Sequence, residues 1–262
     1  MNYGLYLSAS GVLTNLYRQD VFANNLANVH TVGFKPDMAM IRQRAPESVE
    51  SQTGFEFQQD LLDRLGGGVF AGPQGVNMTS GHLQETSGDL DAAIESRNAF
   101  FAVSVTNPAN GQSEVQWTRD GRFAVNKQGY LVMVAGGHRV LDPDGKPIQL
   151  DTSASSHISP SADVVQNGEA TARIHVAEVV DPDLLAKVGG SRFRFNGPDR
   201  LLRSIDHPKL RPGFVEASGV DPIKALMDVI NTTKTATANG NLIRYHDLLM
   251  DRAVNVLGRV TA

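Results

Sequence analysis

Apolar residues recur at helical spacing along the first part of the chain. Residues 3–29 contain no proline, and apolar side chains follow one another in steps of three, four or seven, with Gln19 as a polar interruption. This heptad-like spacing predicts a helix whose apolar seam packs against another helix. Gly33 follows the predicted helix and suits a left-handed exit from it. The seam consists of Leu5, Ala9, Val12, Leu16, Ala23 and Leu26.

A second apolar stripe runs through the C-terminal end of the chain. Asp221 and Pro222 form a good helix start, with Asp as the N-cap and Pro at the first helical position. Residues 231–241 are polar and rich in Thr and Asn, so we expect this helix to be weak in its middle. The stripe consists of Ile223, Leu226, Ile230, Leu242, Leu249, Val256 and Val260.

The middle of the chain, from about residue 100 to residue 195, alternates as β-strands do. Two apolar runs, FFAVSV and EVQWT, flank a turn at Asn110-Gly111, and Asp120-Gly121 predicts a tight hairpin. Residues 142–145 supply another turn. Further strands are predicted in RFAVN, YLVMVA, TARIHVAEVV and SRFRFNG.

A helix at each end therefore brackets an antiparallel β-rich domain. This order predicts an α+β fold in which long N- and C-terminal helices pack as a coiled-coil-like stalk and the β-rich domain is inserted between them. An apolar stripe is also typical of a helix that faces its own core, but chain ends more often fray, and the position of both stripes there favours a role in assembly. The predicted parts are a terminal helical assembly domain at 1–33 and 220–262, an extended connector at 34–75 and 205–219, and a β-rich domain at 76–204.

Composition narrows the possible functions. The 262 residues carry a net charge of -4 and no cysteine. Nucleic-acid binding usually needs a basic face, and the lack of cysteine excludes disulfides, thiolate nucleophiles and cysteine-ligated zinc. No apolar run approaches the roughly 18 residues of a membrane-spanning helix. The N-terminus lacks the basic start and apolar run of a secretory signal, so a role outside the cytoplasm would need another export route.

No residue pattern predicts catalysis, a cofactor or a metal site. The seven histidines show no close ligand spacing. Residues 142–145 resemble only a fragment of a calcium loop, and the glycines at 66–68 are not followed by the Gly-Lys-Ser/Thr of a P-loop. Trp117, the single tryptophan, favours core packing. We therefore expect a protein that is not an enzyme and binds no cofactor.

Three asparagines lie at the end of the first predicted helix, although asparagine is a poor helix former. On the heptad, Asn24, Asn25 and Asn28 point away from the seam positions of Ala23 and Leu26. One interpretation is that they suit a fraying helix end. The other is that their amides form hydrogen bonds across subunits, where a wholly apolar face would risk premature aggregation.

The segment ANNLAN (23–28), followed by Gly33, Phe34 and Lys35, resembles the N-terminal signature of the flagellar rod, hook and hook-associated axial proteins. Length and motifs look most like the proximal and distal rod proteins of the flagellar basal body. Two departures stand out: SRNA (96–99) replaces a Gly-x-Gly, and KTATAN (234–239) lacks the Tyr and Glu of the family's C-terminal motif. Three further segments are similar to the family, namely DLDAAIESRNAFFAV, WTRDGRFAVNKQGYLV and FVEASGVDPIKALMDVI.

The resemblance implies a structural subunit. Such proteins leave the cell unfolded through the flagellar type III export apparatus without a cleaved signal, and polymerise helically into the rod, the drive shaft that crosses the periplasm. Their terminal helices surround the export channel. The implied partners are further copies of the chain, other rod and hook proteins, the export apparatus and the rings around the rod. The expected assembly interface consists of Leu5, Val12, Leu16, Ala23, Asn24, Asn25, Leu26, Asn28, Gly33, Phe34, Ile223, Leu226, Ile230, Asn239, Leu242, Leu249 and Val256.

Three alternatives stay open at this point. A hook or hook-associated axial protein belongs to the same class. An adhesin-like β module on a coiled-coil stalk belongs to another, and it predicts a folded dimer or trimer in solution. A hydrolase would need a clustered acid/base pair, which the sequence does not show. The weak helicity of both ends favours coupled folding and assembly, in which burial against neighbouring subunits offsets the cost of ordering.

Overall fold

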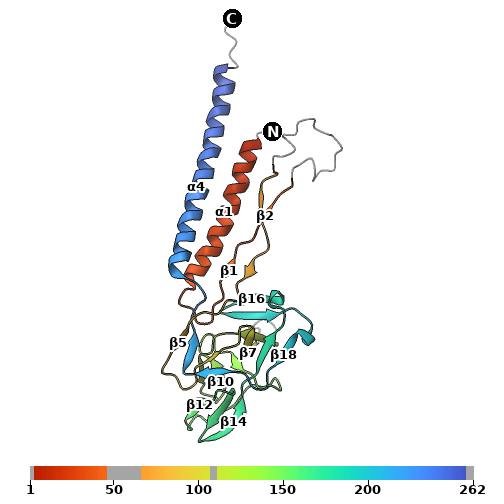
Figure 1. The fold of residues 1–262 in the computed structure, drawn as a ribbon, viewed down its shortest axis with the longest axis vertical. Helices are drawn as coiled ribbons and strands as arrows, with labels where there is room; N and C mark the ends of the chain where they lie inside the picture. Colours follow the sequence, from red (N-terminus) through yellow and green to blue (C-terminus); the bar gives the residue numbers. More distant parts are fainter. Residues whose placement is uncertain (1–2, 46–65, 107–110, 258–262) are drawn as a thin grey trace. The chain divides into compact units, whose positions relative to one another are not determined.

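A computed structural model describes residues 3–45, 66–106 and 111–257 of the chain (Figure 1). Two long helices lie at its ends: α1 (Tyr3–Ala27), and α4 (Pro222–Arg252), which a π-helical turn, η3 (Ala253–Leu257), continues. The elements between them are mainly strands. The predicted α+β fold with terminal helices and a β-rich middle is therefore confirmed.

The chain divides into two compact units. The helical unit contains the described residues within 1–27, 37–75 and 221–262, and the β-rich unit contains those within 28–36 and 76–220. These points of division differ from the predicted ones. Residues 28–36 join the β-rich unit, and the predicted connector at 205–219 contributes two of its strands.

The helices of the helical unit pack against one another, as the red and blue ribbons of Figure 1 show. The predicted start of α4 is confirmed, because the carboxylate of Asp221 accepts hydrogen bonds from the backbone N–H groups of Ile223 (2.9 Å) and Lys224 (3.0 Å). Threonine hydroxyls within residues 232–237 donate to carbonyl oxygens three or four residues earlier. With its hydroxyls bonded in this way, the polar middle of α4 is continuous helix.

A two-stranded ribbon completes the helical unit. β2 (Ile41–Gln43) pairs antiparallel with β3 (Val69–Ala71), and Arg42 lies opposite Phe70. β1 (Asp37–Met38) precedes the ribbon, and β4 (Gly75–Val76) follows it where the chain passes into the β-rich unit. Residues 46–65, which belong to the predicted connector, lie outside the described residues.

An antiparallel sheet organises the β-rich unit. Among the described residues it has nine strands, seven of them in the order β16-β17-β8-β7-β11-β10-β9, while β15 pairs with β7 and β18. The two predicted strands FFAVSV and EVQWT form the long β7–β8 pair, and RFAVN with YLVMVA forms the β9–β10 hairpin. The strands of this unit are β5 (Leu83–Glu85), β6 (Ala92–Ile94), β7 (Ala99–Thr106), β8 (Ser113–Thr118), β9 (Phe123–Val125), β10 (Leu131–Met133), β11 (Arg139–Val140), β12 (Ser156–Ile158), β13 (Asp163–Gln166), β14 (Glu169–Arg173), β15 (Val176–Val179), β16 (Leu185–Gly189), β17 (Arg192–Phe195), β18 (Leu202–Ser204), β19 (Leu210–Pro212) and β20 (Phe214–Glu216).

Two clusters of buried apolar side chains form the core of this unit. Phe101 and Phe123 belong to the first, with ring centroids 5.1 Å apart in an edge-to-face pair. Phe100, Trp117 and Phe193 belong to the second. Successive residues of a strand point to opposite faces, which is why Phe100 and Phe101 enter different clusters. The burial of Trp117 confirms its predicted place in the core.

The hairpin predicted at Asp120-Gly121 is wrong. β8 and β9, which flank this dipeptide, are not paired with each other in the described sheet. Asp120 is buried, and its carboxylate accepts hydrogen bonds from the Arg122 guanidinium at 2.7 and 3.0 Å. The turn predicted at 142–145 is confirmed by a hydrogen bond from the N–H of Gly145 to the carbonyl of Asp142 (2.9 Å). Asn110, part of the other predicted turn, lies outside the described residues.

Candidate functional site

In the described residues the apolar stripe of α4 is exposed, and the stripe of α1 is exposed at three of its six positions. On α1, Leu5, Leu16 and Ala23 are exposed, whereas Val12 and Leu26 are half-buried. On α4, the exposed fraction of the stripe residues ranges from 43% for Ile230 to 72% for Ile223. The predicted seam is therefore not the one that joins the two helices. The exposed members on α4 are Ile223, Leu226, Ile230, Leu242 and Leu249, while the side chains of Val256 and Val260 lie outside the described residues.

Small and polar residues form the contact between α1 and α4. A Cβ atom on Gly4 would lie 2.8 Å from the imidazole of His246, and one on Gly11 would lie 2.6 Å from the amide nitrogen of Asn239. Both pairs are separated by seven residues on each helix, so the helices run antiparallel in a heptad register. Asn239, which we expected in the assembly interface, thus contacts α1 of its own chain.

The same seven-residue series continues toward the start of α4. Ala225 and Thr232 precede Asn239 at intervals of seven, and both are buried. Glycine and other small residues allow two backbones to approach closely. Most of the larger apolar side chains of α4, and Leu5, Leu13 and Leu16 of α1, are left exposed, whereas Val21 of α1 is buried.

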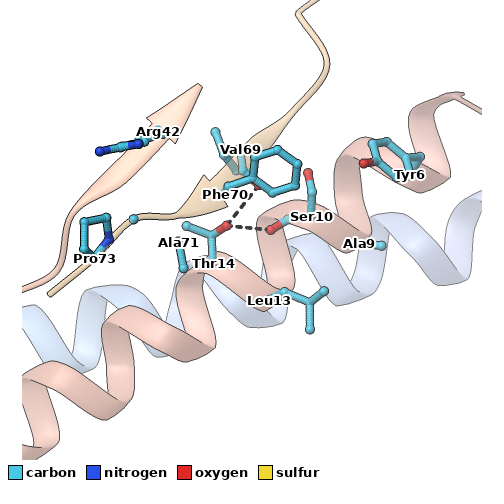
Figure 2. A pocket seen from close by; sticks show the side chains of 11 residues that line it. Tyr6, Ala9, Ser10, Leu13, Thr14, Arg42, Val69, Phe70, Ala71 and Pro73 are labelled. Atoms are coloured by element: carbon cyan, nitrogen blue, oxygen red, sulfur yellow. Dashed lines mark hydrogen bonds between the residues drawn. The ribbon is translucent and has the colours of Figure 1, made fainter. Parts of the chain in front are cut away.

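A groove runs between α1 and the β2–β3 ribbon of the helical unit (Figure 2). It encloses about 650 Å³ and is lined mainly by apolar side chains. The hydroxyl of Thr14 donates to the carbonyl of Ser10 at 2.8 Å and to that of Val69 at 3.5 Å, which joins helix and ribbon. The lining includes Tyr6, Ala9 and Leu13 of α1 and Arg42, Phe70 and Pro73 of the ribbon and its flank.

The three asparagines at the end of α1 have different surroundings. Asn25 is 6% exposed, and its side-chain amide both donates to the carbonyl and accepts from the N–H of Asp37, each at 2.8 Å. The idea that this amide bonds across subunits is therefore wrong, because it serves within the chain. Asn28 is half-buried and accepts a hydrogen bond from the hydroxyl of Thr31 (3.1 Å). Asn24 is exposed.

The Gly-Phe-Lys part of the N-terminal signature, residues 33–35, is bound in the β-rich unit. Gly33 has a φ of +67°, which confirms the predicted left-handed exit. A Cβ atom at this position would lie 2.5 Å from the carbonyl carbon of Arg119. The N–H of Gly33 donates to the carbonyl of Glu216 at 2.7 Å. Only glycine fits this position without moving the backbone against which it lies.

Phe34 is also held inside the chain. Its ring is 7% exposed and lies 4.0 Å from the ammonium of Lys187, a cation–π contact. Its carbonyl accepts from the N–H of Gly219 at 2.9 Å. Neither Gly33 nor Phe34 is therefore exposed for contact with another molecule.

Glu216 is the centre of a buried ionic cluster in the β-rich unit. Its Oε1 accepts from Nζ of Lys35 (2.7 Å) and from the N–H of Gly81 (2.9 Å), and its Oε2 accepts from Nε of Arg119 (2.7 Å). The three side chains are at most 2% exposed. Further donors of both cations reach backbone carbonyl oxygens. These bonds compensate the desolvation of the buried charges.

The cluster contains two cations, Lys35 and Arg119, and one carboxylate, that of Glu216. Burial acts to raise the pKa of Glu216, but Arg119 and Lys35 beside it hold that pKa below its usual value. Burial lowers the pKa of Lys35; Glu216 opposes this shift and Arg119 adds to it. Removal of Glu216 would therefore leave two buried cations without the carboxylate that pairs with both of them.

The cluster also joins segments that are far apart in the sequence. Lys35 comes just before the chain leaves the β-rich unit for the first time, and Gly81 follows its return at residue 76. Glu216 comes just before the final departure at residue 220. One carboxylate therefore joins residues that lie near three of the four points at which the chain passes between the units.

Comparison with known proteins identifies the family. Residues 5–35 match the family described as "Flagella basal body rod protein". The chain is 29% identical to the flagellar basal-body rod protein FlgF of Caulobacter vibrioides, over 99% of this chain and 100% of that protein. It is 27% identical to FlgF of Mesorhizobium japonicum (98% and 99% covered) and 25% identical to FlgG of Bacillus subtilis (96% and 98% covered).

This chain belongs to the flagellar basal-body rod protein family. The matches with individual proteins extend over nearly the whole chain, and therefore over both terminal helices and the β-rich unit. Rod proteins are structural proteins, so the expectation that the chain is not an enzyme is confirmed. In residues 3–45, 66–106 and 111–257, no three His, Cys, Asp or Glu side chains gather as metal ligands would. No helix in that part of the chain is both long enough and apolar enough to cross a membrane.

The structure divides the rod-family signature into two parts with different roles. ANNLAN lies at the end of α1, where the side chain of Asn25 forms hydrogen bonds with the backbone of Asp37. The Gly-Phe-Lys part belongs to the β-rich unit, where Lys35 forms an ion pair with Glu216. Arg119 and Glu216 are not among the site residues predicted from the sequence. Both lie in segments that carry the family resemblance, but a single sequence does not show that they meet Lys35.

Proposed function

We propose that this chain is a subunit of the flagellar rod that polymerises helically into the periplasmic drive shaft and the wall of its export channel. The observation that carries this proposal is the outward orientation of the apolar stripes on α1 and α4. A contiguous exposed apolar surface marks an interaction site. Full burial of one Leu or Ile side chain contributes about 1.5–3 kcal/mol, so several on each helix can drive association. Heterologous contacts that do not close a ring produce a helical assembly.

The antiparallel pair of α1 and α4 acts, in this proposal, as a coiled-coil-like element within each subunit. The contacts of Gly4 with His246 and of Gly11 with Asn239 support its heptad register. The pair presents its two apolar stripes to neighbouring subunits. Residues 231–241, which have low helix propensity, support the view that assembly helps to order the helix.

The structure revises the expected assembly interface. Asn25, Gly33, Phe34 and Asn239 are engaged inside the chain and are no longer proposed as contacts with other subunits. Val256 stays a prediction. The proposed interface retains Leu5, Val12, Leu16, Ala23, Asn24, Leu26, Asn28, Ile223, Leu226, Ile230, Leu242 and Leu249.

The proposed partners are further copies of the chain and other rod and hook proteins. The proposed location is the flagellar basal body, reached through the type III export apparatus without a cleaved signal, and the surrounding rings are further candidate partners. The names of the relatives, which are basal-body rod proteins, support the location and the axial partners.

The proposal is tested by changing the outward stripe of α4. In the triple variant Leu226→Gln, Ile230→Gln and Leu249→Gln, we expect polymerisation of the purified protein to be lost, because the burial free energy at the contact is removed. Sedimentation and electron microscopy of concentrated protein measure the effect.

The matched control changes three exposed apolar residues of the β-rich unit, Val115→Gln, Val134→Gln and Val180→Gln, whose exposed fractions of 45–56% are comparable. This control should polymerise like the unchanged protein. If both triple variants polymerise equally well, the outward stripe is not the assembly surface.

A further inference from the structure

Two apolar features of the helical unit are not covered by other residues in the described part of the chain. The first is the groove between α1 and the β2–β3 ribbon (Figure 2). At this groove Leu13 is 69% exposed and Phe70 is 47% exposed. Its volume of about 650 Å³ leaves room for several aliphatic side chains.

The second feature is the end of α4. Because His246 lies at Gly4, the following residues of α4 run past the first described residue of α1, as the blue ribbon in Figure 1 shows. Every residue from Asp247 to Asn255 is exposed. This segment includes Leu248, Leu249, Met250 and Val254, with exposed fractions between 52% and 66%. It is a helical end rich in apolar side chains, and none of its residues is buried against α1.

The two features cannot meet within one chain. The groove lies along residues 6–14 of α1, whereas the register of the helix pair places residues 247–255 of α4 beyond Gly4. They can meet only between copies. The contact would join different surfaces on the two molecules, so each copy would still offer a free groove or a free helix end to the next one.

Charge favours the same pairing. Arg42 lines the groove and is exposed, whereas Asp247 and Asp251 lie four residues apart, beside the apolar residues of the α4 end. Exposed ion pairs add little affinity, but they suppress wrong partners and help to fix the register of a contact.

We infer that the groove between α1 and the β2–β3 ribbon receives the α4 end, residues 247–255, of a second copy of this chain. This inference rests on the proposed function and specifies one of its contacts. Leu248 and Leu249 enter the groove near Leu13 and Phe70, and Arg42 faces the aspartates. Repetition of this head-to-tail contact extends the polymer.

Disulfide formation between copies tests the contact directly, because the chain has no cysteine of its own. Leu13→Cys and Leu249→Cys are made in separate chains, which are mixed at polymerising concentration and oxidised. The matched control mixes Leu13→Cys with Ile223→Cys, which places an equally accessible cysteine at the other end of α4. We expect at least about tenfold more cross-linked dimer for the 13–249 pair, since a specific contact raises the effective concentration of the two thiols.

A charge rescue provides the second measurement. Leu13→Glu alone should abolish polymerisation, because the new carboxylate would face Asp247 and Asp251. The double variant Leu13→Glu, Leu249→Lys should restore it, because each contact would then join a glutamate to a lysine. Both positions are more than 60% exposed, so neither change disturbs the core.

The outcomes separate this inference from the proposed function. Polymers that form without the 13–249 cross-link and without charge rescue would overturn the groove contact alone. A chain that stays monomeric at every concentration would overturn both. Preferential 13–249 cross-linking together with rescue would establish the contact.

Discussion

The two units of this rod-family protein use apolar residues in opposite ways. The β-rich unit buries its apolar residues in two clusters, and it also contains a buried ionic cluster at Glu216. The helical unit joins α1 to α4 through Gly4, Gly11 and polar residues, and leaves most of its large apolar side chains outside. The first arrangement suits a unit that is stable alone, and the second suits one that gains its stability from neighbours. Four experiments, which start from the largest expected effect and end on the smallest, test this contrast.

The largest effect should come from the choice of the first residue in a fragment that contains the β-rich unit without α1 and α4. A fragment of residues 28–220 keeps Gly33, Phe34 and Lys35, and we expect it to fold cooperatively as a monomer. A fragment of residues 37–220 loses the burial of Phe34, worth about 1.5–3 kcal/mol, and leaves the cluster without Lys35. We expect it to be destabilised by about 3–5 kcal/mol or to fail to fold.

Urea denaturation followed by tryptophan fluorescence compares the two fragments, because Trp117 lies in the core of the β-rich unit. Equal stability of the fragments would show that residues 28–36 are only a linker.

Replacement of Glu216 should have the next largest effect. Glu216→Gln keeps the shape of the side chain but leaves Lys35 and Arg119 buried without a counter-charge, and we expect a loss of about 3–5 kcal/mol in the free energy of unfolding. The control is Glu114→Gln, which removes the exposed partner of Arg194 and should cost about 0–1 kcal/mol. Similar losses in both variants would contradict the central role of Glu216.

The cluster also makes the unfolding free energy depend on pH. The pKa of Glu216 is lower in the folded than in the unfolded state, so its contribution is complete above the unfolded pKa of about 4.3 and is lost as pH falls through the folded pKa. The pKa of Lys35 is also lowered by folding, so stability rises as pH climbs between the folded value and the unfolded value of about 10.4. Glu216→Gln should reduce the acid-side dependence, to which Asp163, hydrogen-bonded to Arg173, also contributes a lowered pKa; denaturation at several pH values measures the difference.

The smallest effect concerns the asparagines at the end of α1. Asn25→Ala removes two hydrogen bonds to the backbone of Asp37 and should destabilise the helical unit by about 1–3 kcal/mol. Asn24→Ala, one residue away and exposed, should strengthen the isolated helix by a few tenths of a kcal/mol. Helical circular dichroism during thermal unfolding measures both.

Polymerisation then separates the two interpretations of Asn24. If its amide contacts another subunit, Asn24→Ala weakens the polymer despite the stronger helix. If polymerisation is unchanged, Asn24 only suits the end of the helix and makes no contact with another subunit.

The elements that the sequence predicted well depend on neighbouring residues. The cap at Asp221, the left-handed residue Gly33 and the β9–β10 hairpin follow from local side-chain chemistry and alternation. Asp120-Gly121 failed as a hairpin signal because β8 pairs with β7, the strand before it, and with β17, which is distant along the chain, and this pairing overrides the local turn preference. Periodicity located the apolar stripes but not their orientation, since an apolar face is equally compatible with an intrachain seam and with an outer surface.

By itself, the sequence determined the α+β order, the two terminal helices with their apolar stripes, and the motifs of the rod family. These features depend on the spacing of neighbouring residues and on short segments of the sequence. Packing in three dimensions places small residues between α1 and α4, leaves the α4 stripe exposed, and divides the signature between two units at Asn25 and Lys35. The contacts of Gly11 with Asn239, and of Glu216 with Lys35 and Arg119, join residues 97 to 228 positions apart. No local preference encodes such contacts, and only packing of the whole chain brings these side chains together.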